Sequence, residues 1–115
     1  MKIDVIAEVL DATILYDPGL GDREFRCACG ADLMSDVLAF VKQDALLLSG
    51  LINAHVVRTA DMMDIKCIVF VRGKTPPQDV ISVAKDAEIA ILSTRQTMFT
   101  ACGLLYENGL TGSAT

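Results

Sequence analysis

The sequence predicts a three-layer α/β/α domain with a mostly parallel sheet, and two patterns carry the prediction. Three short apolar runs begin at an even spacing of 22 residues, at Ala45, Cys67 and Ile89. Each run is apolar at every position, which is typical of strands buried on both faces of a parallel sheet. A stretch with apolar residues at helical spacing follows each run. The chain from Ala45 onward therefore reads as three β-α units with right-handed crossovers.

Each predicted helix has a start signal. The helices that follow the three strands are expected to begin at Asn53, at a capping box over residues 75–78 (Thr-Pro-Pro-Gln) and at Thr94. Asp32 is the expected cap of a helix ahead of the first strand, and Gly109 is expected to end the last helix. The residues predicted to face inward are Met34, Val37, Leu38, Val41, Val56, Val57, Ala60, Met63, Val80, Ile81, Ala84, Met98, Ala101, Cys102 and Leu105.

The N-terminal quarter predicts a short α-β-β lead-in to the β-α units. Residues 2–10 have the spacing of an amphipathic helix, residues 13–16 read as a strand, and residues 24–29 alternate like a second strand. The residues that this alternation places on one face are Phe25, Cys27 and Cys29. We interpret the second strand as an edge strand or half of a small hairpin, outside the buried parallel sheet, because alternation suits a strand with one buried face.

Length, charge and cysteine content limit the function classes. The 115 residues leave room for one domain, expected over residues 1–110, with residues 111–115 as a flexible C-terminal tail. The net charge of −5 argues against nucleic-acid binding, because phosphate neutralisation needs clustered cations. No apolar run approaches the roughly 20 residues of a membrane span. Asp4 stands where a signal peptide would be apolar, so we expect a cytoplasmic protein with reduced cysteines.

Small polar and basic residues mark the expected ligand site. Ligands of open α/β sheets bind at the carboxyl ends of the parallel strands, beside helix N-termini. Hydroxyls at these positions can donate and accept hydrogen bonds, and glycines let the backbone approach a ligand closely. The candidate ligand-binding residues are Ser35, Asp36, Ser49, Gly50, Asn53, Arg72, Gly73, Lys74, Ser93 and Thr94. A simpler interpretation of Asn53 and Thr94 is that they act only as helix caps.

Residues 73–75 (Gly-Lys-Thr) resemble the end of a phosphate-binding P-loop, but the loop itself is missing. The motif requires a glycine at position 68, where the chain has Ile68 inside a predicted strand. Pro76 and Pro77 also remove two backbone N–H donors. The alternatives that remain are a weaker anion site, with the basic residues of the turn as donors, and a solvated βα turn.

Cys27 and Cys29 would place two sulfur atoms on one face of a strand, as in half of a metal site. Zinc and iron–sulfur sites need about four ligands, and Cys67, Cys102 and His55 fall in elements that do not converge on this strand. We therefore expect partly buried thiols and no metal or other cofactor. No Ser-His-Asp order, paired carboxylates or GxGxxG motif forms a catalytic constellation, so we expect no enzymatic activity.

Four segments closely resemble the DRTGG-domain family in its free-standing form: residues 30–39, 48–51, 56–60 and 68–77. The likeness extends over about residues 2–110. Related domains occur in the N-terminal half of HPr kinase/phosphorylase and between CBS modules. The resemblance implies a non-catalytic regulatory or ligand-sensing domain with a Mur-ligase-N-terminal-like α/β fold that pairs as a homodimer.

We therefore expect a cytoplasmic, homodimeric regulatory or adaptor domain that senses a small anionic metabolite or nucleotide, or binds a protein partner. The hydrophobic content of 52% should leave an apolar face for a second copy. We expect that face on the helix at residues 32–42 and the strand at residues 24–29, paired by a two-fold axis. The alternatives are a small phosphotransferase-related enzyme and a thiol or metal redox protein that uses Cys27 and Cys29.

Overall fold

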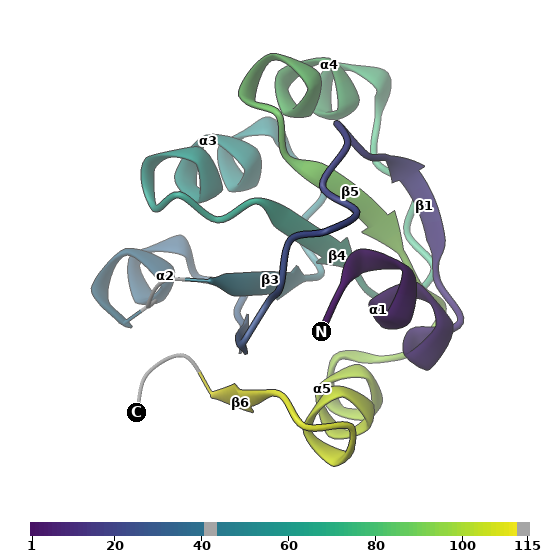
Figure 1. The fold of residues 1–115 in the computed structure, drawn as a ribbon. Helices are drawn as coiled ribbons and strands as arrows, with labels where there is room; N and C mark the ends of the chain where they lie inside the picture. The colour runs from purple at the N-terminus through teal and green to yellow at the C-terminus, as the bar shows by residue number, and fades with distance from the viewer. Residues whose placement is uncertain (41–43, 113–115) are drawn as a thin grey trace.

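The computed structural model describes residues 1–40 and 44–112 (Figure 1). These residues form a six-stranded sheet between two layers of helices, which confirms the predicted three-layer α/β/α architecture. None of the described helices is long and apolar enough to cross a membrane. The elements are α1 (Ile3–Leu10), β1 (Thr13–Tyr16), β2 (Cys27–Gly30), α2 (Met34–Phe40), β3 (Ala45–Ser49), α3 (Ala54–Met62), β4 (Cys67–Phe70), α4 (Gln78–Ala87), β5 (Ala90–Ser93), α5 (Met98–Glu107) and β6 (Thr111–Gly112).

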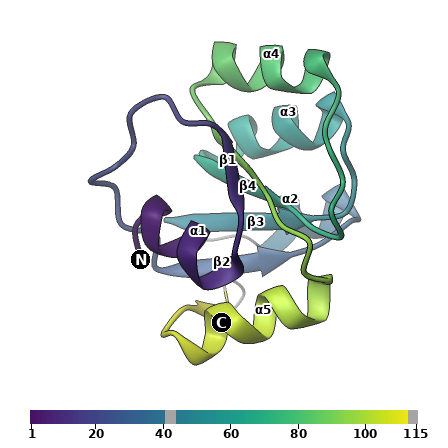
Figure 2. The ribbon, with the colours of Figure 1, turned by 90° about the vertical axis from the view of Figure 1, so that its right-hand side faces the viewer.

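The strands follow the order β1-β5-β4-β3-β2-β6. The strands from β5 to β6 run parallel, and β1 joins β5 in the antiparallel sense, with Thr13 opposite Ser93. Helices α2, α3 and α4 cover one face of the sheet, and α1 and α5 cover the other (Figures 1 and 2). All described crossovers from β2 to β5 therefore lie on one face.

The central strands are apolar at every position because both of their faces are covered. In β3, Leu46 and Leu48 pack into the core with α1 and α5, whereas Leu47 packs into the core with α2, α3 and α4. All three are fully buried, and burial of each such side chain contributes about 1.5–3 kcal/mol relative to exposure. The three apolar runs of the sequence correspond to β3, β4 and β5.

The helices present most of their predicted apolar stripes to these cores. Asn53 caps α3 as expected, because its Oδ1 accepts a hydrogen bond from the Val56 N–H at 3.2 Å. Gly109 follows the C-cap of α5 with a φ of 107°, a conformation that favours glycine. The predicted stripe residues that are buried are Met34, Val37, Val56, Val57, Ala60, Val80, Ala84, Ala101 and Leu105, while Met63, Ile81, Met98 and Cys102 are half-buried. The predictions for the Leu38 side chain and for Val41 fall outside the described part of the chain.

The α-β-β order of the N-terminal quarter is confirmed, but the predicted placement of the strand at residues 24–29 is wrong. The strand begins at Cys27, pairs in parallel with β3 and lies inside the sheet, because β6 pairs with its other edge. Phe25 precedes the strand and packs with α1 and α5, whereas Cys29 packs against the opposite core. The alternation of the segment therefore does not mark an edge strand or a hairpin. Its second partner comes from the far end of the chain, which the local pattern does not reveal.

The C-terminal end also departs from the prediction. Thr111 and Gly112, assigned to a flexible tail at residues 111–115, form β6 beside Cys27 and Ala28. The ladder with β2 satisfies backbone groups that a solvated tail would leave to water. Residues 113–115 lie outside the described part of the chain.

The predicted capping box at residues 75–78 does not form. Helix α4 begins at Gln78, and the residue ahead of it, Pro77, is extended (φ −61°, ψ 161°) and makes no side-chain cap. Thr75 and Pro76 each precede a proline, a position that disfavours helical backbone. Helix α4 therefore begins only after the two prolines.

Two further predicted caps make tertiary hydrogen bonds instead. Helix α5 is capped by Thr97, whose Oγ1 accepts a backbone N–H three residues later, whereas Thr94 Oγ1 donates to the Leu10 carbonyl at 2.7 Å. Asp32 lies ahead of α2, and its carboxylate accepts the Gly50 N–H at 2.7 Å. Both hydrogen bonds join segments that are distant in sequence, so local cap preferences could not indicate them.

Candidate functional site

The connections that leave β4 and β5 diverge to opposite faces of the sheet. β4 continues into α4, which packs with α2 and α3, and β5 continues into α5, which packs with α1. Such a divergence opens a crevice beyond the carboxyl ends of the two strands, the usual ligand position in open α/β sheets. β4 and β5 are direct neighbours, so the crevice of this sheet lies between their two loops.

A polar pocket of about 410 Å³, called here the carboxyl-edge pocket, lies in this crevice. It is lined by Asp11, Thr13, Gly73, Thr75, Ser93, Thr94 and Arg95. Three segments build it: the α1–β1 junction, the β4–α4 loop and the β5–α5 loop. The α1–β1 junction reaches the pocket because β1 runs antiparallel to β5, which places Thr13 beside Ser93.

Backbone hydrogen bonds hold the two loops of the pocket together. Arg72 and Gly73 adopt left-handed backbone conformations, with φ values of 66° and 68°. Their N–H groups donate to the carbonyls of Gln96 and Thr94 at 2.9 and 2.8 Å. Because these two donors are already bound within the protein, they are not available to a ligand. Gly73 therefore serves the shape of the turn.

The two hydroxyls at the end of β5 have different roles. Thr94 is 2% exposed, and its Oγ1 donates to the Leu10 carbonyl at 2.7 Å and accepts the Gln96 N–H at 3.2 Å. Ser93 is half-buried, and its Oγ donates to the Lys74 carbonyl at 2.9 Å, which leaves its lone pairs to accept a further hydrogen bond. Thr94 is therefore structural, whereas Ser93 can still accept from a ligand.

A second polar cluster joins the loops that follow β2, β3 and β4. The Asp32 carboxylate accepts hydrogen bonds from Ser49 Oγ at 3.2 Å and from the Gly50 N–H at 2.7 Å. Lys74 Nζ donates to the Gly50 carbonyl at 2.8 Å. A Cβ at Gly50 would lie 3.4 Å from both Asp32 carboxylate oxygens, so a larger residue would press on this contact. Ser49, Gly50 and Lys74 thus meet in a cluster that fixes the loops, outside the pocket lining.

The remaining sequence candidates are divided by the structure. Ser35 and Asp36 are exposed in the first turn of α2, Asn53 caps α3, and Arg72 is exposed on the turn beside the pocket. The candidates that line the pocket are Gly73, Ser93 and Thr94.

Four lining residues are absent from the sequence candidates. Thr75 and Arg95 follow the predicted ends of two strands closely, and that position alone could have indicated them. Asp11 and Thr13 reach the pocket only because β1 pairs with β5. No local pattern in the sequence shows this pairing.

The β4–α4 and β5–α5 loops carry three cations, Arg72, Lys74 and Arg95, in a chain whose net charge is −5. Within residues 1–40 and 44–112, none of the three forms an ion pair. Arg95 lines the pocket, and its Cγ lies 3.8 Å from the position of a Cβ at Gly73, so the arginine stem lies close to the turn. An arginine beside hydroxyls can bind an anion through two parallel hydrogen bonds.

The thiols offer no comparable site. Among the described residues, no three His, Cys, Asp or Glu side chains converge as a metal site would require. Burial raises the pKa of Cys67 to about 12, with a smaller contribution from Asp17. Burial, and then the neighbouring Cys29, raises the pKa of Cys102. Because the thiolate is the form that binds metals and attacks electrophiles, Cys67 and Cys102 are held in the unreactive thiol form.

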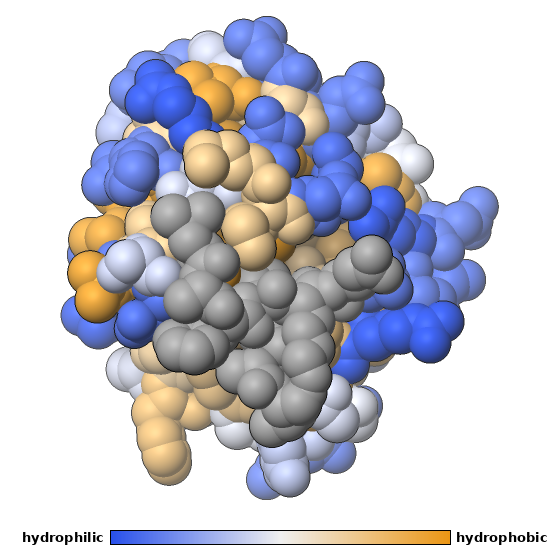
Figure 3. All heavy atoms as spheres, turned by 90° about the vertical axis from the view of Figure 1, so that its left-hand side faces the viewer, coloured by the Kyte–Doolittle hydropathy of each residue, from blue (hydrophilic) through white to orange (hydrophobic). Residues whose placement is uncertain are grey.

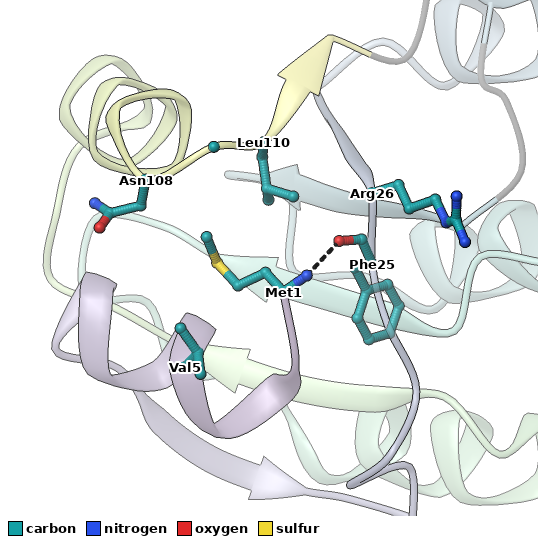
Figure 4. A pocket seen from close by; sticks show the side chains of 7 residues that line it. Met1, Val5, Phe25, Arg26, Asn108 and Leu110 are labelled. Atoms are coloured by element: carbon teal, nitrogen blue, oxygen red, sulfur yellow. Dashed lines mark hydrogen bonds between the residues drawn. The ribbon is translucent and has the colours of Figure 1, made fainter.

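A second cavity, of about 420 Å³, lies between α1, the start of β2 and the end of α5 (Figure 4). This amino-edge pocket is lined by Met1, Val5, Phe25, Arg26, Asn108, Gly109 and Leu110. Most of these side chains are apolar, and the Met1 amino group already donates to the Phe25 carbonyl at 2.7 Å. The Arg26 side chain extends away from the apolar ones (Figure 4). The carboxyl-edge pocket, with its hydroxyls and Arg95, is therefore the candidate site for a polar ligand.

These features define a small three-layer α/β domain with one antiparallel edge strand and a polar crevice at the carboxyl edge of its sheet. The family model of the DRTGG domain matches residues 5–107. The chain therefore belongs to the DRTGG domain family, which confirms the resemblance seen in the sequence.

The chain is also similar to a solved structure of the CBS and DRTGG domains from the regulatory region of Clostridium perfringens pyrophosphatase, complexed with the activator diadenosine tetraphosphate. The two share 18% sequence identity with a TM-score of 0.75, and the similarity covers 99% of this chain and 50% of that one. This chain thus spans about half the length of its structural neighbour, and the likeness concerns the fold. Among the curated proteins, none matches this chain.

Proposed function

We propose that this chain is a regulatory domain that binds a small anionic metabolite or nucleotide in the carboxyl-edge pocket and has no catalytic activity of its own. The observation that carries the proposal is Arg95, which forms no ion pair with the residues that the structure describes and lies beside the hydroxyls of Thr75 and Ser93. This is the crevice where open α/β sheets bind ligands. The volume of about 410 Å³ lies in the range of small-molecule sites. Membership of the DRTGG family, and similarity to part of a regulatory region, support a regulatory role.

The pocket suits a domain that responds to a ligand by a change in the stability of its segments and not by catalysing a reaction. Three separate segments line it, and Thr94 already ties the end of α1 to the β5–α5 loop through Leu10. A ligand that contacts all three segments stabilises them as one unit. A partner protein that contacts α1 or α5 would then bind the ligand-loaded and empty states with different affinities.

Thermal unfolding with inorganic pyrophosphate, AMP, ATP and diadenosine tetraphosphate tests the proposal. At least one of these probes is expected to raise the Tm, since a ligand at 100 times its Kd stabilises the folded state by about 2.7 kcal/mol. Arg95→Ala is expected to abolish the shift. Arg58→Ala removes an exposed arginine from the middle of α3 and should retain it. No shift with any probe, or an equal shift in Arg95→Ala, would contradict the proposal.

We further propose that the domain acts in the cytoplasm as a homodimer. Large apolar side chains are exposed on α5, where Phe99 is 88% and Tyr106 is 73% exposed. On the side of the molecule that carries α2 and α3, hydrophobic atoms also reach the surface between hydrophilic ones (Figure 3). β6 pairs with the edge of β2 opposite β3, so β2 has no open edge for a second copy, and we place the dimer interface on the helical faces.

Static light scattering at micromolar concentration tests the homodimer. The expected mass is twice the 12.4 kDa of one chain, and Phe99→Asp should lower it towards the single-chain value. A wild-type protein that scatters as a monomer at the highest concentration used would rule the homodimer out.

A further inference from the structure

We propose that the carboxyl-edge pocket takes a nucleoside phosphate, with the ribose hydroxyls bound by the Asp11 carboxylate and the phosphate bound by Arg95. This inference rests on the proposed function and specifies its ligand class. It starts from a carboxylate and a guanidinium that line the same pocket without forming an ion pair with each other. Within the described residues, no ion pair or side-chain hydrogen bond engages either the Asp11 carboxylate or the Arg95 guanidinium.

The backbones that carry Asp11 and Arg95 are fixed relative to one another. Asp11 is the C-cap of α1, with a left-handed φ of 50°, and its N–H donates to carbonyls in the last turn of that helix. The hydrogen bond of 2.7 Å from Thr94 Oγ1 to the Leu10 carbonyl joins the residue before Arg95 to the residue before Asp11. The pairing of Thr13 with Ser93 joins the same two segments a second time, where β1 meets β5. The backbones that carry the two charged groups are therefore held on two sides of one pocket.

The opposite charges select a ligand that is anionic at one end and a hydrogen-bond donor at the other. A simple phosphate would be attracted by Arg95 and repelled by Asp11. In a nucleoside phosphate, the vicinal ribose hydroxyls donate to a carboxylate, and the phosphate accepts from a guanidinium. The hydroxyls of Thr75 and Ser93 supply further hydrogen-bonding groups on the pocket wall.

An amino acid also carries one charge of each sign, but the surroundings of the pocket favour the nucleotide. Arg72 and Lys74, in the loop that contributes Gly73 and Thr75, add positive charge beside the pocket and attract a ligand with a net negative charge. A nucleoside phosphate has such a charge, whereas a neutral amino acid is a zwitterion. The volume of about 410 Å³ also exceeds what a small amino acid would fill.

Titration calorimetry of the full chain with the four ribonucleoside 5′-monophosphates and their 2′,3′-dideoxy counterparts tests the inference. The tightest ribonucleotide is expected to bind at least about tenfold more tightly than its dideoxy form, the size of a lost hydrogen bond to a charged group. Asp11→Asn should reduce this ratio to about one without weakening the dideoxy form, because the amide is a poorer acceptor. Arg95→Ala should weaken both forms by about the same factor.

Asp64→Asn provides the matched control. Asp64 is also an exposed aspartate with a left-handed φ, 56°, but it follows α3 outside the pocket. Asparagine tolerates this conformation at both positions, so neither variant should disturb the fold. The ribose preference should therefore survive in Asp64→Asn.

The outcomes separate this inference from the proposed function. Equal binding of ribose and dideoxyribose forms, with both weakened in Arg95→Ala, would overturn the inference and leave the proposed function standing. Binding of pyrophosphate without any nucleotide would have the same meaning. A ribose preference that persists in Asp11→Asn would overturn the role of Asp11. Absence of binding by every probe would overturn both proposals.

Discussion

The loops at the two edges of the parallel sheet differ in how their charged side chains are paired. At the amino edge, acidic residues with left-handed φ values of 59°, 56° and 58° stand between a helix and the next strand: Asp44, Asp64 and Glu88. At the carboxyl edge, the loops after β4 and β5 carry the cations Arg72, Lys74 and Arg95. The loops of both edges thus include left-handed backbone positions, at the three acids on one side and at Arg72 on the other.

The difference lies in the partners of these charges, because two of the three amino-edge acids, Asp44 and Asp64, form ion pairs. Asp44 lies 3.8 Å from side-chain nitrogens of both Arg23 and Arg26, and Asp64 lies 3.5 Å from Lys66 Nζ. The cations of the carboxyl edge have no ion pair within residues 1–40 and 44–112. The two pockets follow the same division, since the amino-edge pocket is mainly apolar and the carboxyl-edge pocket is polar. Because Lys74 Nζ is already bound to the Gly50 carbonyl, Arg72 and Arg95 are the charges available to a ligand at the polar pocket.

Removal of the Thr94 hydroxyl is expected to have the largest effect on this comparison. Thr94→Val keeps the shape of the side chain but leaves the Leu10 carbonyl and the Gln96 N–H without their partner. An unsatisfied buried polar group costs about 1–3 kcal/mol, so urea denaturation should show a free energy of unfolding about 2 kcal/mol lower. Ligand binding should weaken too, because the bond that positions Asp11 is lost.

Thr59→Val is the control for Thr94→Val. Thr59 in α3 is equally buried, at 2% exposed, and its hydroxyl makes no hydrogen bond in the described part of the chain. The expected loss is below about 0.5 kcal/mol, because no partner is stranded. Equal losses in the two variants would mean that the Thr94 hydroxyl does not hold the carboxyl edge together.

Glycine substitutions at the two edges should have smaller effects and separate backbone strain from ligand binding. Glu88 at the amino edge and Arg72 at the carboxyl edge hold left-handed backbones, with φ values of 58° and 66°. Glycine adopts this conformation without steric cost, so Glu88→Gly and Arg72→Gly are each expected to raise the free energy of unfolding by about 0.5–1 kcal/mol. Only Arg72→Gly should weaken nucleotide binding, and mainly at low salt, because it removes a charge near the pocket.

Calorimetric titrations of both glycine variants at low and high salt check this prediction. If Arg72→Gly binds as tightly as Glu88→Gly at low salt, the positive charge of the turn does not contribute to the site. If Arg72→Gly is less stable than the wild type, the left-handed backbone at this position is not strained.

The strands and helix faces could be predicted because their signals are local. The leucines of β3 are apolar in succession since both faces of the sheet are covered, and Val56, Val57 and Ala60 follow the period of a single helix. The position of β2 could not be predicted, because its second neighbour, β6, comes from the other end of the chain. Alternation over residues 24–29 carried no information about that neighbour.

The candidate site was predicted in part for the same reason. Gly73 and Ser93, which line the pocket, could be predicted because the ends of their strands are visible in the sequence. Asp11 depends on the pairing of β1 with β5, and Thr94 bonds to Leu10 across 84 residues of sequence. Thr94 and Asp32, which were predicted as helix caps, likewise make hydrogen bonds to segments distant in sequence.

The most direct test of the central claim is an NMR titration of the isotope-labelled chain with the tightest nucleotide of the panel. If the carboxyl edge binds the ligand, the amide signals of Asp11, Gly73 and Arg95 should shift with a common Kd. Those of Val5 and Leu110 at the amino-edge pocket should stay in place. Shifts centred on Val5 and Leu110, with the carboxyl-edge signals unmoved, would contradict the account.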